Sequence, residues 1–292
     1  MIHTSKQLKD KVRNLSRGDN QTAQMMIRNF IMERLLERVS LSGYQNNFIL
    51  KGGMLVASLV GIDTRATMDI DTTIRALPLN EDEAVQIVNE IIHIQIEDGI
   101  SFEIVKVSEI MSDFEYPGIR MVLEASLDRL KQRIKVDIST DDAITPSAIR
   151  YSYRLMFEDR CIELLTYTPE TLLSEKIQTI LARGITTTRM RDFYDIYEIM
   201  DGNKVHIDKK ILLEAFLATC RKRKTIFEPE EIEVILSEIS SDEGLEDLWK
   251  LYRNDNFYVG DIEWTSVCEA VCACIRNHIA SFLWRSEETE GD

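Results

Sequence analysis

The periodicity of apolar residues changes once along this chain of 292 residues, near residue 165. Before that point, short apolar stretches in which every second residue is polar alternate with helical stretches, a pattern typical of strands and helices that share one sheet. After it, apolar side chains recur every three to four residues and strand-like alternation is nearly absent. The sequence therefore predicts an α/β or α+β domain at residues 1–165 and an all-helical domain at residues 166–292.

The same periodicities place the individual elements. The predicted strands are residues 48–50, 67–74, 102–107, 120–125 and 133–138, and the predicted helices of the first domain are residues 21–39, 54–60 and 80–96. The predicted helices of the second domain are residues 169–183, 189–200, 207–223, 229–252 and 264–284. Pro169 and Gly184 are suitable start and stop signals for the first of these.

The overall charge excludes a protein that coats nucleic acid with its whole surface. The chain has 35 Lys and Arg against 50 Asp and Glu, a formal net charge of −15. Nonspecific binding of nucleic acid depends on basic side chains that neutralise phosphates. Only a local basic surface on an acidic body remains compatible with a nucleic-acid partner.

The remaining composition predicts a cytoplasmic protein. No apolar stretch reaches the roughly 18 residues that a membrane-spanning helix needs, and the charged start of the chain lacks the apolar core of a secretory signal. Five cysteines are an odd number in a chain long enough to form a large core without disulfides, which favours a reducing compartment. We expect no membrane partner.

The segment that contains Asp69 and Asp71 carries the most informative chemistry. Residues i and i+2 of a strand face the same side, so the two carboxylates project together. Such a pair suits Mg²⁺ or Mn²⁺ bound together with a substrate phosphate. Upstream, Gly52 and Gly53 form a turn whose backbone N–H groups can approach phosphate oxygens, and Arg65 can add a fork of donors to the same phosphates.

A third acid fits this scheme. Asp137 projects to the side of its strand opposite Val136 and Ile138. If this strand lies beside that of Asp69 and Asp71, three carboxylates surround one or two metal ions. Each feature alone has a simpler interpretation, because an isolated Asp-x-Asp is usually an exposed strand face and an isolated Gly-Gly is usually a turn. Their order along the chain favours the metal site.

Two charged motifs lie in the helical domain. Lys176 sits on a predicted helix rich in Leu and Ile, and Asp192 follows paired arginines at the start of the next helix. Spacing alone favours structural interpretations of both: Lys176 extends to solvent, and Asp192 pairs with an arginine or stabilises the helix N-terminus.

Together, these motifs resemble the AbiEii/AbiGii toxin family of bacterial nucleotidyltransferases, which belongs to the DNA polymerase β-like nucleotidyltransferase superfamily. The motifs are Lys51-Gly52-Gly53, Arg65-x-x-x-Asp69-x-Asp71, Leu173-x-Glu175-Lys176 and Arg191-Asp192-x-Tyr194-Asp195, in the family's order. The resemblance implies a polymerase β-like mixed sheet flanked by helices and followed by an all-helical C-terminal domain.

The resemblance also implies an activity. It implies transfer of NMP from an NTP, with Mg²⁺, to an RNA acceptor such as a tRNA 3′ end. Such proteins are usually toxins of toxin–antitoxin pairs in phage defence or growth control, so the resemblance implies a cognate antitoxin as a partner. The resemblance implies that Asp69 and Asp71 hold metal and that Asp192 completes the site across the domain cleft. It also implies that Asp137, placed by strand registration, is the third metal-holding acid and helps to activate the acceptor hydroxyl. The implied nucleotide-binding residues are Lys51, Gly52, Gly53, Arg65 and Lys176.

The chain departs from the family pattern at Met54, where the family more often has Thr or Ser. A hydroxyl contact to phosphate is therefore missing, which leaves two alternatives open. One is a catalytically weak module of the same fold that binds a nucleotide or a partner protein. The other is a phosphotransferase that acts on a different acceptor.

Two further clusters have structural interpretations that we favour. Cys268, Cys272, Cys274 and His278 lie on one predicted helix, and a single helix rarely surrounds a tetrahedral zinc ion. The basic run at residues 221–224 is either a solvated helix end or a contact for the phosphate backbone of an RNA acceptor.

Overall fold

The computed structural model describes residues 2–61, 65, 67, 69–77, 80–110, 118–140, 142–201 and 205–283. The chain divides into two compact units. Unit 1 contains Met1–Ser58, Ala66–Asp142 and Ile149–Thr166, and unit 2 contains Leu59–Arg65, Ala143–Ala148 and Tyr167–Asp292. Unit 1 thus ends next to the boundary expected after residue 165, while two short earlier segments group with the helical unit.

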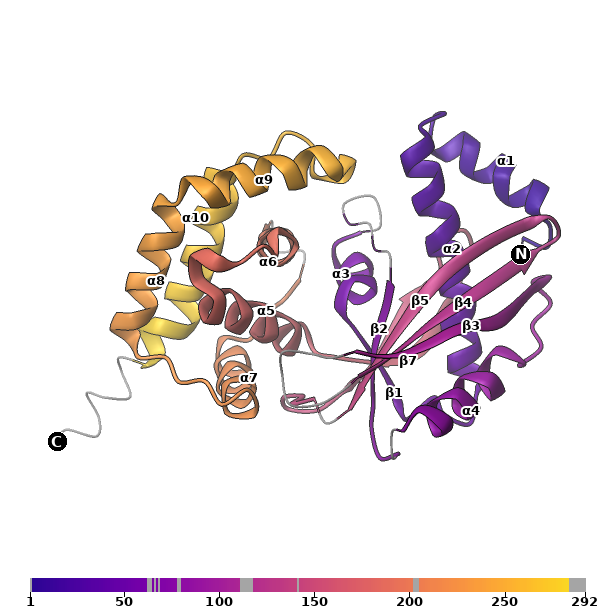
Figure 1. Ribbon diagram of the computed structural model, residues 1–292, viewed down its shortest axis with the longest axis horizontal. Helices are drawn as coiled ribbons and strands as arrows, with labels where there is room; N and C mark the ends of the chain where they lie inside the picture. Colours follow the sequence, from indigo (N-terminus) through magenta and orange to yellow (C-terminus); the bar gives the residue numbers. More distant parts are fainter. Residues whose placement is uncertain are drawn as a thin grey trace. The chain divides into compact units, whose positions relative to one another are not determined.

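Unit 1 contains a seven-stranded sheet with the strand order β3-β4-β5-β2-β1-β7-β6 (Figure 1). The strands are β1 Phe48–Lys51, β2 Asp69–Ile74, β3 Ile100–Ile110, β4 Gly118–Leu127, β5 Leu130–Thr140, β6 Ile149–Arg154 and β7 Cys161–Thr166. β2 is parallel to β5 and β1 is parallel to β7, whereas the other neighbouring strands are antiparallel. The predicted α+β class and mixed sheet are confirmed.

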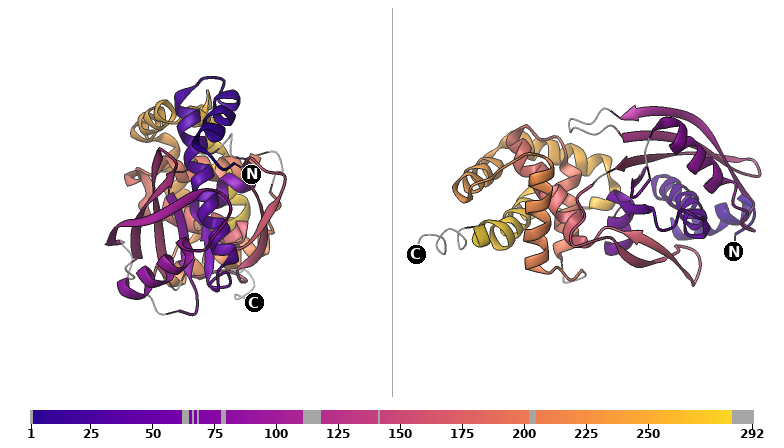
Figure 2. Two further views of the ribbon diagram at one scale, coloured as in Figure 1. Left: turned by 90° about the vertical axis from the view of Figure 1, so that its right-hand side faces the viewer. Right: turned by 90° about the horizontal axis from the view of Figure 1, so that it is seen from below.

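Two of the four helices that the structure describes in unit 1, α2 Asn20–Leu41 and α4 Glu81–Ile92, cover one face of this sheet. The other two are α1 Ser5–Leu15 and α3 Gly52–Val60. Helices α2 and α4 lie on the same side of the sheet (Figure 2), where Leu36 and Val88 line one apolar core with Leu50, Ile70 and Val136 of the strands. Because neighbouring residues of a strand face opposite sides, the acidic residues between these apolar positions project from the other face.

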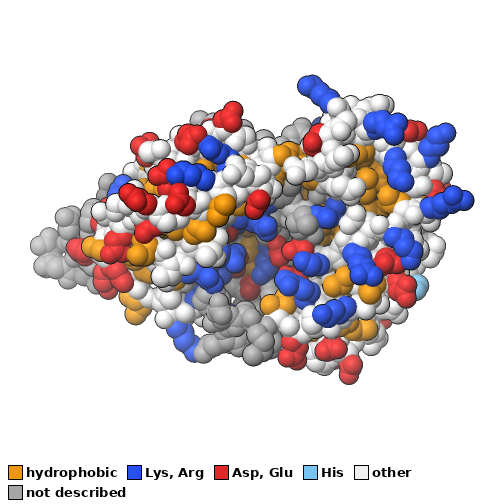
Figure 3. Space-filling model, turned by 45° about the horizontal axis from the view of Figure 1, so that its top comes forward, with side chains coloured by type: hydrophobic (Ala, Val, Ile, Leu, Met, Phe, Trp, Pro, Cys, Tyr) orange, Lys and Arg blue, Asp and Glu red, His pale blue; other side chains and the backbone are white. Residues whose placement is uncertain are grey.

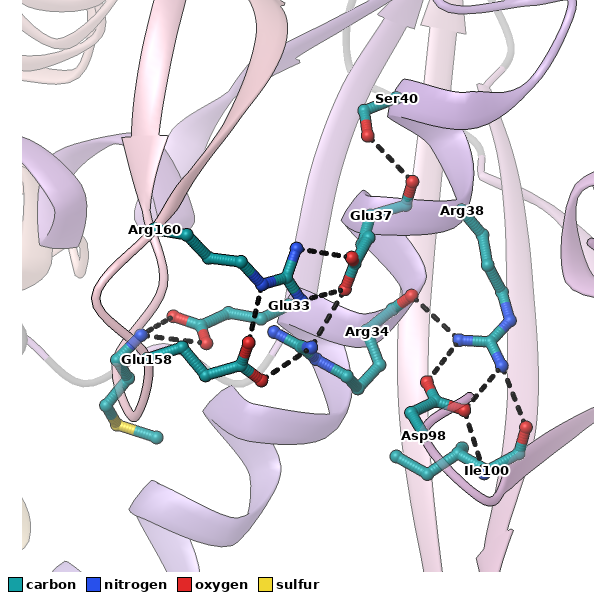
Figure 4. Close-up of polar contacts among 10 residues, drawn as sticks. Glu33, Arg34, Glu37, Arg38, Ser40, Asp98, Ile100, Glu158 and Arg160 are labelled. Carbon is teal, nitrogen blue, oxygen red and sulfur yellow. Dashed lines mark hydrogen bonds and ion pairs between the residues drawn. The ribbon is translucent and has the colours of Figure 1, made fainter. Parts of the chain in front are cut away.

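Buried ion pairs fix α2 to the rest of unit 1 (Figure 4). Arg34 lies 2.8 Å from Glu37 and 3.2 Å from Glu158, in the turn between β6 and β7. One turn later, Arg38 holds Asp98, just before β3, at 2.7 Å. Charges are tolerated inside a protein only when they are paired and hydrogen-bonded. The network therefore specifies where α2 lies against the strands.

Unit 2 is helical. Its helices are α5 Pro169–Arg183, α6 Met190–Met200, α7 Lys209–Lys222, α8 Pro229–Ser241, α9 Glu243–Asp255 and α10 Trp264–Ile275, with short 3₁₀ turns at Gly184–Thr186 and Phe257–Val259 and a π-helical segment at Arg276–Ala280. Aromatic side chains form its centre, where Phe193 packs against Trp264 and Tyr194 against Trp249. Across the described ranges, no helix combines the length and the apolar character needed to cross a bilayer.

The predicted single helix at residues 229–252 is wrong. The structure has two helices, because Asp242 adopts an extended backbone conformation between them. Its carboxylate accepts the backbone N–H of Leu245 at 2.8 Å and so caps the start of α9. A similar error extends α4 to residue 96, although the helix ends at Ile92.

The hairpin of β6 and β7 was not predicted. Most residues of β6 are exposed, with only Tyr153 buried, so the strand lacks the apolar alternation that marks a half-buried strand. At the other end of the chain, the predicted helix at residues 264–284 is α10 followed by the π-helical segment, and Trp284 lies outside the described residues.

Candidate functional site

Two neighbouring parallel strands bring acidic residues together on the face of the sheet that α2 and α4 do not cover. Asp71 of β2 is in register with Asp137 of β5, and Asp69 is in register with Lys135. The condition set from the sequence, that the strand of Asp137 lies beside that of Asp69 and Asp71, is therefore met. The neighbouring side chains decide what these acids can do.

The turn between β1 and α3 is built around the carboxylate of Asp71. Gly52 has a φ of +63°, which residues with a side chain rarely adopt. A Cβ atom at this position would lie 2.0 Å from Oδ2 of Asp71. Gly53 donates its backbone N–H to the same oxygen at 3.4 Å. The glycine turn thus positions an acidic side chain, in addition to the phosphate-binding role predicted for it.

The surroundings of Asp71 disfavour its negative charge. Burial raises the pKa of Asp71, and the charges of Asp137 and Asp69 raise it further, whereas Lys51 and the N–H of Gly53 lower it. The net direction is upward. Because an adjacent cation favours the charged form of a carboxylate, this position is suited to a positively charged ligand.

Lys51 ends β1 close to the acidic residues. Its Nζ lies 2.8 Å from Oγ of Ser139 and 2.5 Å from Oδ2 of Asp142. The side chain is 17% exposed. A contact between Lys51 and a nucleotide phosphate, as predicted from the motif, would require the ammonium group to share or exchange these partners.

Arg120 of β4, which the sequence analysis did not single out, holds Asp137 with a two-pronged contact. Nε lies 2.7 Å from Oδ1 and Nη2 lies 2.6 Å from Oδ2. Such bidentate pairs are strong and fix orientation as well as charge. The two residues are direct neighbours across β4 and β5. The pair could be predicted only from the register between β4 and β5, which the sequence does not show directly.

Asp69 has an oxygen that the protein leaves without a hydrogen bond. Its Oδ1 is buried from solvent and unbonded within the described residues, and Nζ of Lys135 lies 3.8 Å away. A buried acceptor of this kind is costly, and a divalent cation with a preference for oxygen ligands would satisfy it.

Whether the three acids are arranged as metal ligands is a separate question. Among the residues that the structure describes, no group of three or more His, Cys, Asp or Glu side chains is arranged to hold a metal ion. Both oxygens of Asp137 are engaged by Arg120. Asp69, Asp71 and Asp137 as three metal ligands therefore stay a prediction.

In unit 2, Lys176 of α5 lies between two carboxylates of α6. Its Nζ is 2.9 Å from Oδ1 of Asp192 and 2.7 Å from Oδ2 of Asp195. Burial lowers the pKa of Lys176, but the two carboxylates outweigh burial and leave it raised. Because Lys176 is only 9% exposed, it does not extend into solvent as an isolated surface lysine would.

Two arginines contact these carboxylates, Arg65 from inside unit 2 and Arg189 from an exposed position. Arg65 is 0% exposed, and its Nε lies 2.5 Å from Oδ1 of Asp195. Arg189 lies 2.6 Å from Oδ2 of Asp192. Burial raises the pKa of Asp192, but Lys176 and Arg189 outweigh it and lower the pKa to about 2. The predicted phosphate contact of Arg65 would require its guanidinium to leave Asp195.

The two clusters for which we favoured structural interpretations have local contacts. The sulfur atoms of Cys268 and Cys272 lie 3.9 Å apart beside Ser240. In the basic run at residues 221–224, Arg223 reaches α5 and donates to Oε1 of Gln178 at 2.5 Å. At least one cation of this run is therefore used inside unit 2.

Comparison with known proteins adds to this picture. The family described as the nucleotidyl transferase AbiEii toxin of a type IV toxin–antitoxin system matches residues 34–271. JHP933 from Helicobacter pylori is similar in structure, with a TM-score of 0.52 and 15% sequence identity over 92% of this chain and 97% of that chain. A second H. pylori structure, described as a nucleotidyltransferase, has a TM-score of 0.52 and 15% identity over 90% of this chain and 97% of that chain.

At 15% identity, these two structures share the fold, and they say nothing further about this chain's chemistry. No curated protein matches the sequence. The family match, however, spans most of the chain and includes the glycine turn, the acidic strands and the lysine–aspartate cluster of α5 and α6. The chain belongs to the AbiEii family of nucleotidyltransferase toxins of type IV toxin–antitoxin systems.

Proposed function

We propose that this protein is a cytoplasmic, Mg²⁺-dependent toxin of phage defence that transfers NMP from an NTP to an RNA acceptor such as a tRNA 3′ end. The observation that carries the proposal is the position of Asp71. Its carboxylate is held against the Gly52 turn, beside Asp69 and Asp137, in surroundings that disfavour its negative charge. A cationic ligand would favour the charged form of this carboxylate.

The acidic residues would hold the metal. Asp71 and the unbonded Oδ1 of Asp69 are the donors that fit it best. Asp137 would join them if Arg120 released one of its oxygens. The chemistry that a divalent ion supplies when bound here is positive charge beside the phosphate oxygens.

The transfer itself is a substitution at phosphorus. A hydroxyl oxygen of the acceptor forms a bond to the α-phosphorus of the NTP, and the bond from that phosphorus to the oxygen bridging to the β-phosphate breaks. Pyrophosphate leaves with the bonding electron pair. We assign Asp137 as the acceptor of the hydroxyl proton, at an oxygen that Arg120 releases, while the remaining contact with Arg120 keeps the carboxylate oriented.

The residues of unit 2 are assigned to the triphosphate. Lys176 is charged and buried between Asp192 and Asp195, and it would stabilise the leaving pyrophosphate by sharing or exchanging these partners. Asp192 and Asp195 prevent the burial of this lysine from neutralising it.

Incubation with each of four α-labelled NTPs, Mg²⁺ and total cellular RNA tests the function. We expect one or more labelled RNA species from the wild-type protein and none from Asp71→Asn. Asp159→Asn is the matched control, because the side chain of Asp159 is 98% exposed. Equal labelling by wild type and Asp71→Asn, or no labelling with any RNA or NTP, would contradict the proposal.

A second function is favoured by one observation. Met54, which replaces the hydroxyl residue more usual in the family, is 1% exposed and packs into the core of unit 1. A module that binds NTP without transferring it would tolerate this loss of a phosphate contact. Calorimetry with NTP and Mg²⁺, paired with the labelling assay, separates the two functions, because binding without product supports the module.

A further inference from the structure

Helix α1 is basic in an otherwise acidic chain. Its eleven residues carry Lys6, Lys9, Lys11 and Arg13 against a single acid, Asp10, while the whole chain has a formal net charge of −15. In Figure 3, Lys and Arg side chains gather on the upper right of the visible face, where Figure 1 draws α1. This local charge needs an explanation that the transfer site does not supply.

Three of these cations form one stripe along the helix. Lys6, Lys9 and Arg13 are separated by three and four residues, so they lie on one face of an α-helix. All three are exposed, and across the described residues no carboxylate lies within ion-pair distance of them. The stripe extends over about 10 Å of helix axis at ~1.5 Å per residue, which is long enough to contact more than one phosphate group.

The local structure of the helix does not account for the stripe. Cations favour the C-terminal turn of a helix, where Arg13 lies, but Lys6 lies in the first turn, where the helix dipole disfavours positive charge. A capping box between Thr4 and Gln7 already provides hydrogen-bond acceptors for backbone N–H groups at the N-terminus of the helix. The positive charge of this face is therefore available to an external anion.

The opposite face of α1 fixes the helix in place. Leu8 and Val12 are 0% and 1% exposed, and α1 contacts α2. Ser5 donates its backbone N–H and hydroxyl to Oδ2 of Asp128, in the turn between β4 and β5. A membrane-surface helix inserts its apolar face into lipid, and here that face is mostly buried in protein.

Helix α1 also precedes the family match, which begins at residue 34. We propose that the stripe of Lys6, Lys9 and Arg13 is a binding surface for the phosphodiester backbone of the RNA acceptor. The inference rests on the proposed function for the identity of the polyanion, since a transferase acting on RNA must hold its acceptor. Through Asp128, the helix is fixed to the hairpin of β4 and β5 that carries Arg120 and Asp137.

The test measures binding without transfer. Fluorescence anisotropy of a labelled single-stranded RNA oligonucleotide, with the full chain and no NTP, gives affinity as a function of salt. We compare the wild type with the triple variant Lys6→Gln, Lys9→Gln, Arg13→Gln. The matched control removes the same charge elsewhere, with Lys209→Gln, Lys210→Gln and Lys250→Gln, all of them exposed positions of unit 2.

The logarithm of the affinity falls as the logarithm of the salt concentration rises, and for a single strand each lost phosphate contact makes this slope shallower by about 0.7. We expect the slope of the stripe variant to be shallower by about 2 and its affinity at low salt to be at least tenfold weaker than that of the wild type. The control variant should show a smaller change in both the slope and the affinity. Equal effects of both triple variants, or an unchanged slope in the stripe variant, would overturn the inference. So would stripe-dependent binding to phosphatidylserine vesicles in the absence of RNA binding.

The two proposals fail in different ways. If the wild type binds RNA through the stripe but no NTP labels the RNA, the proposed function is wrong and the binding surface stands. If the wild type labels RNA and the stripe variant binds it normally, the transfer function stands and the role of α1 is wrong. Circular dichroism of the stripe variant verifies folding, which the exposed substitutions should leave unchanged.

Discussion

Gly52 and Asp71 occupy adjoining space so closely that a single added carbon on Gly52 would lie 2.0 Å from the carboxylate of Asp71. A contact of this length is impossible, so either the turn or the carboxylate must move when Gly52 is replaced. The glycine is thus required by an acidic side chain 19 positions later in the sequence.

Gly52→Ala should therefore abolish RNA labelling and destabilise unit 1. The left-handed backbone at φ +63° costs a residue with a Cβ about 1–2 kcal/mol, and displacement of Asp71 adds to this. Thermal unfolding and the labelling assay measure the two effects. Gly43→Ala is the control, because nothing lies within 4 Å of its added Cβ. If Gly52→Ala labels RNA as well as the wild type does, transfer does not require the carboxylate of Asp71 to lie against a glycine at position 52.

Arg120→Lys should reduce transfer by about 10- to 100-fold, the effect typical of residues that orient a metal or proton ligand. Lysine keeps the charge but cannot make the two parallel contacts that hold Asp137. Arg133→Lys is the matched control, since Arg133 is 67% exposed and contacts Glu124 at 3.4 Å. If Asp137 has no part in transfer, the two variants will have equal kcat values, and Arg120 will prove to be structural only.

The sequence predicted the strands of the acidic residues because each has strong local alternation. Ile134, Val136 and Ile138 are buried at 1%, 4% and 1% exposure, and Asp137 faces the other way for the same reason. The weakly patterned β6 could not be found, since its side chains are mostly exposed and its position depends on pairing with β7.

The contacts that the predicted site residues make with other side chains could not be predicted from local sequence patterns. Arg120 faces Asp137 because of a register between β4 and β5 that emerges only in the folded sheet. Lys176 was interpreted from spacing as a solvent-exposed lysine, yet α6 presents Asp192 and Asp195 to it over 16 and 19 positions of sequence. Contacts of this kind join different helices or strands, and the periodicity of apolar residues does not show how such elements pack against one another.

Asp195→Asn should destabilise the helical unit by about 3–5 kcal/mol, as expected when one partner of a buried ion pair is removed. Arg65 would lose its carboxylate and Lys176 would keep only Asp192. All three tryptophans follow residue 167 and belong to unit 2, so urea unfolding followed by tryptophan fluorescence reports on this unit. Asp159→Asn should leave the midpoint unchanged. A loss below 1 kcal/mol in Asp195→Asn would mean that water replaces the lost carboxylate.

Glu33→Gln should stabilise the protein increasingly as the pH rises. Burial raises the pKa of Glu33 to about 8, even though the backbone N–H of Met156 and the charge of Arg34 lower it. Between about pH 4.5 and 8 the folded protein keeps this proton while the unfolded chain releases it, so the wild type loses stability with rising pH.

The expected gain from Glu33→Gln is near zero below pH 4.5, grows through that window and levels off above pH 8. At 1.36 kcal/mol per unit of pKa shift, its upper bound is about 5 kcal/mol. Urea unfolding followed by circular dichroism at several pH values measures it, with Glu97→Gln, an exposed position, as the control. A stability difference that does not vary between pH 5 and pH 8 would mean that Glu33 is ionised in the folded protein, because only a proton held by the fold makes the difference depend on pH.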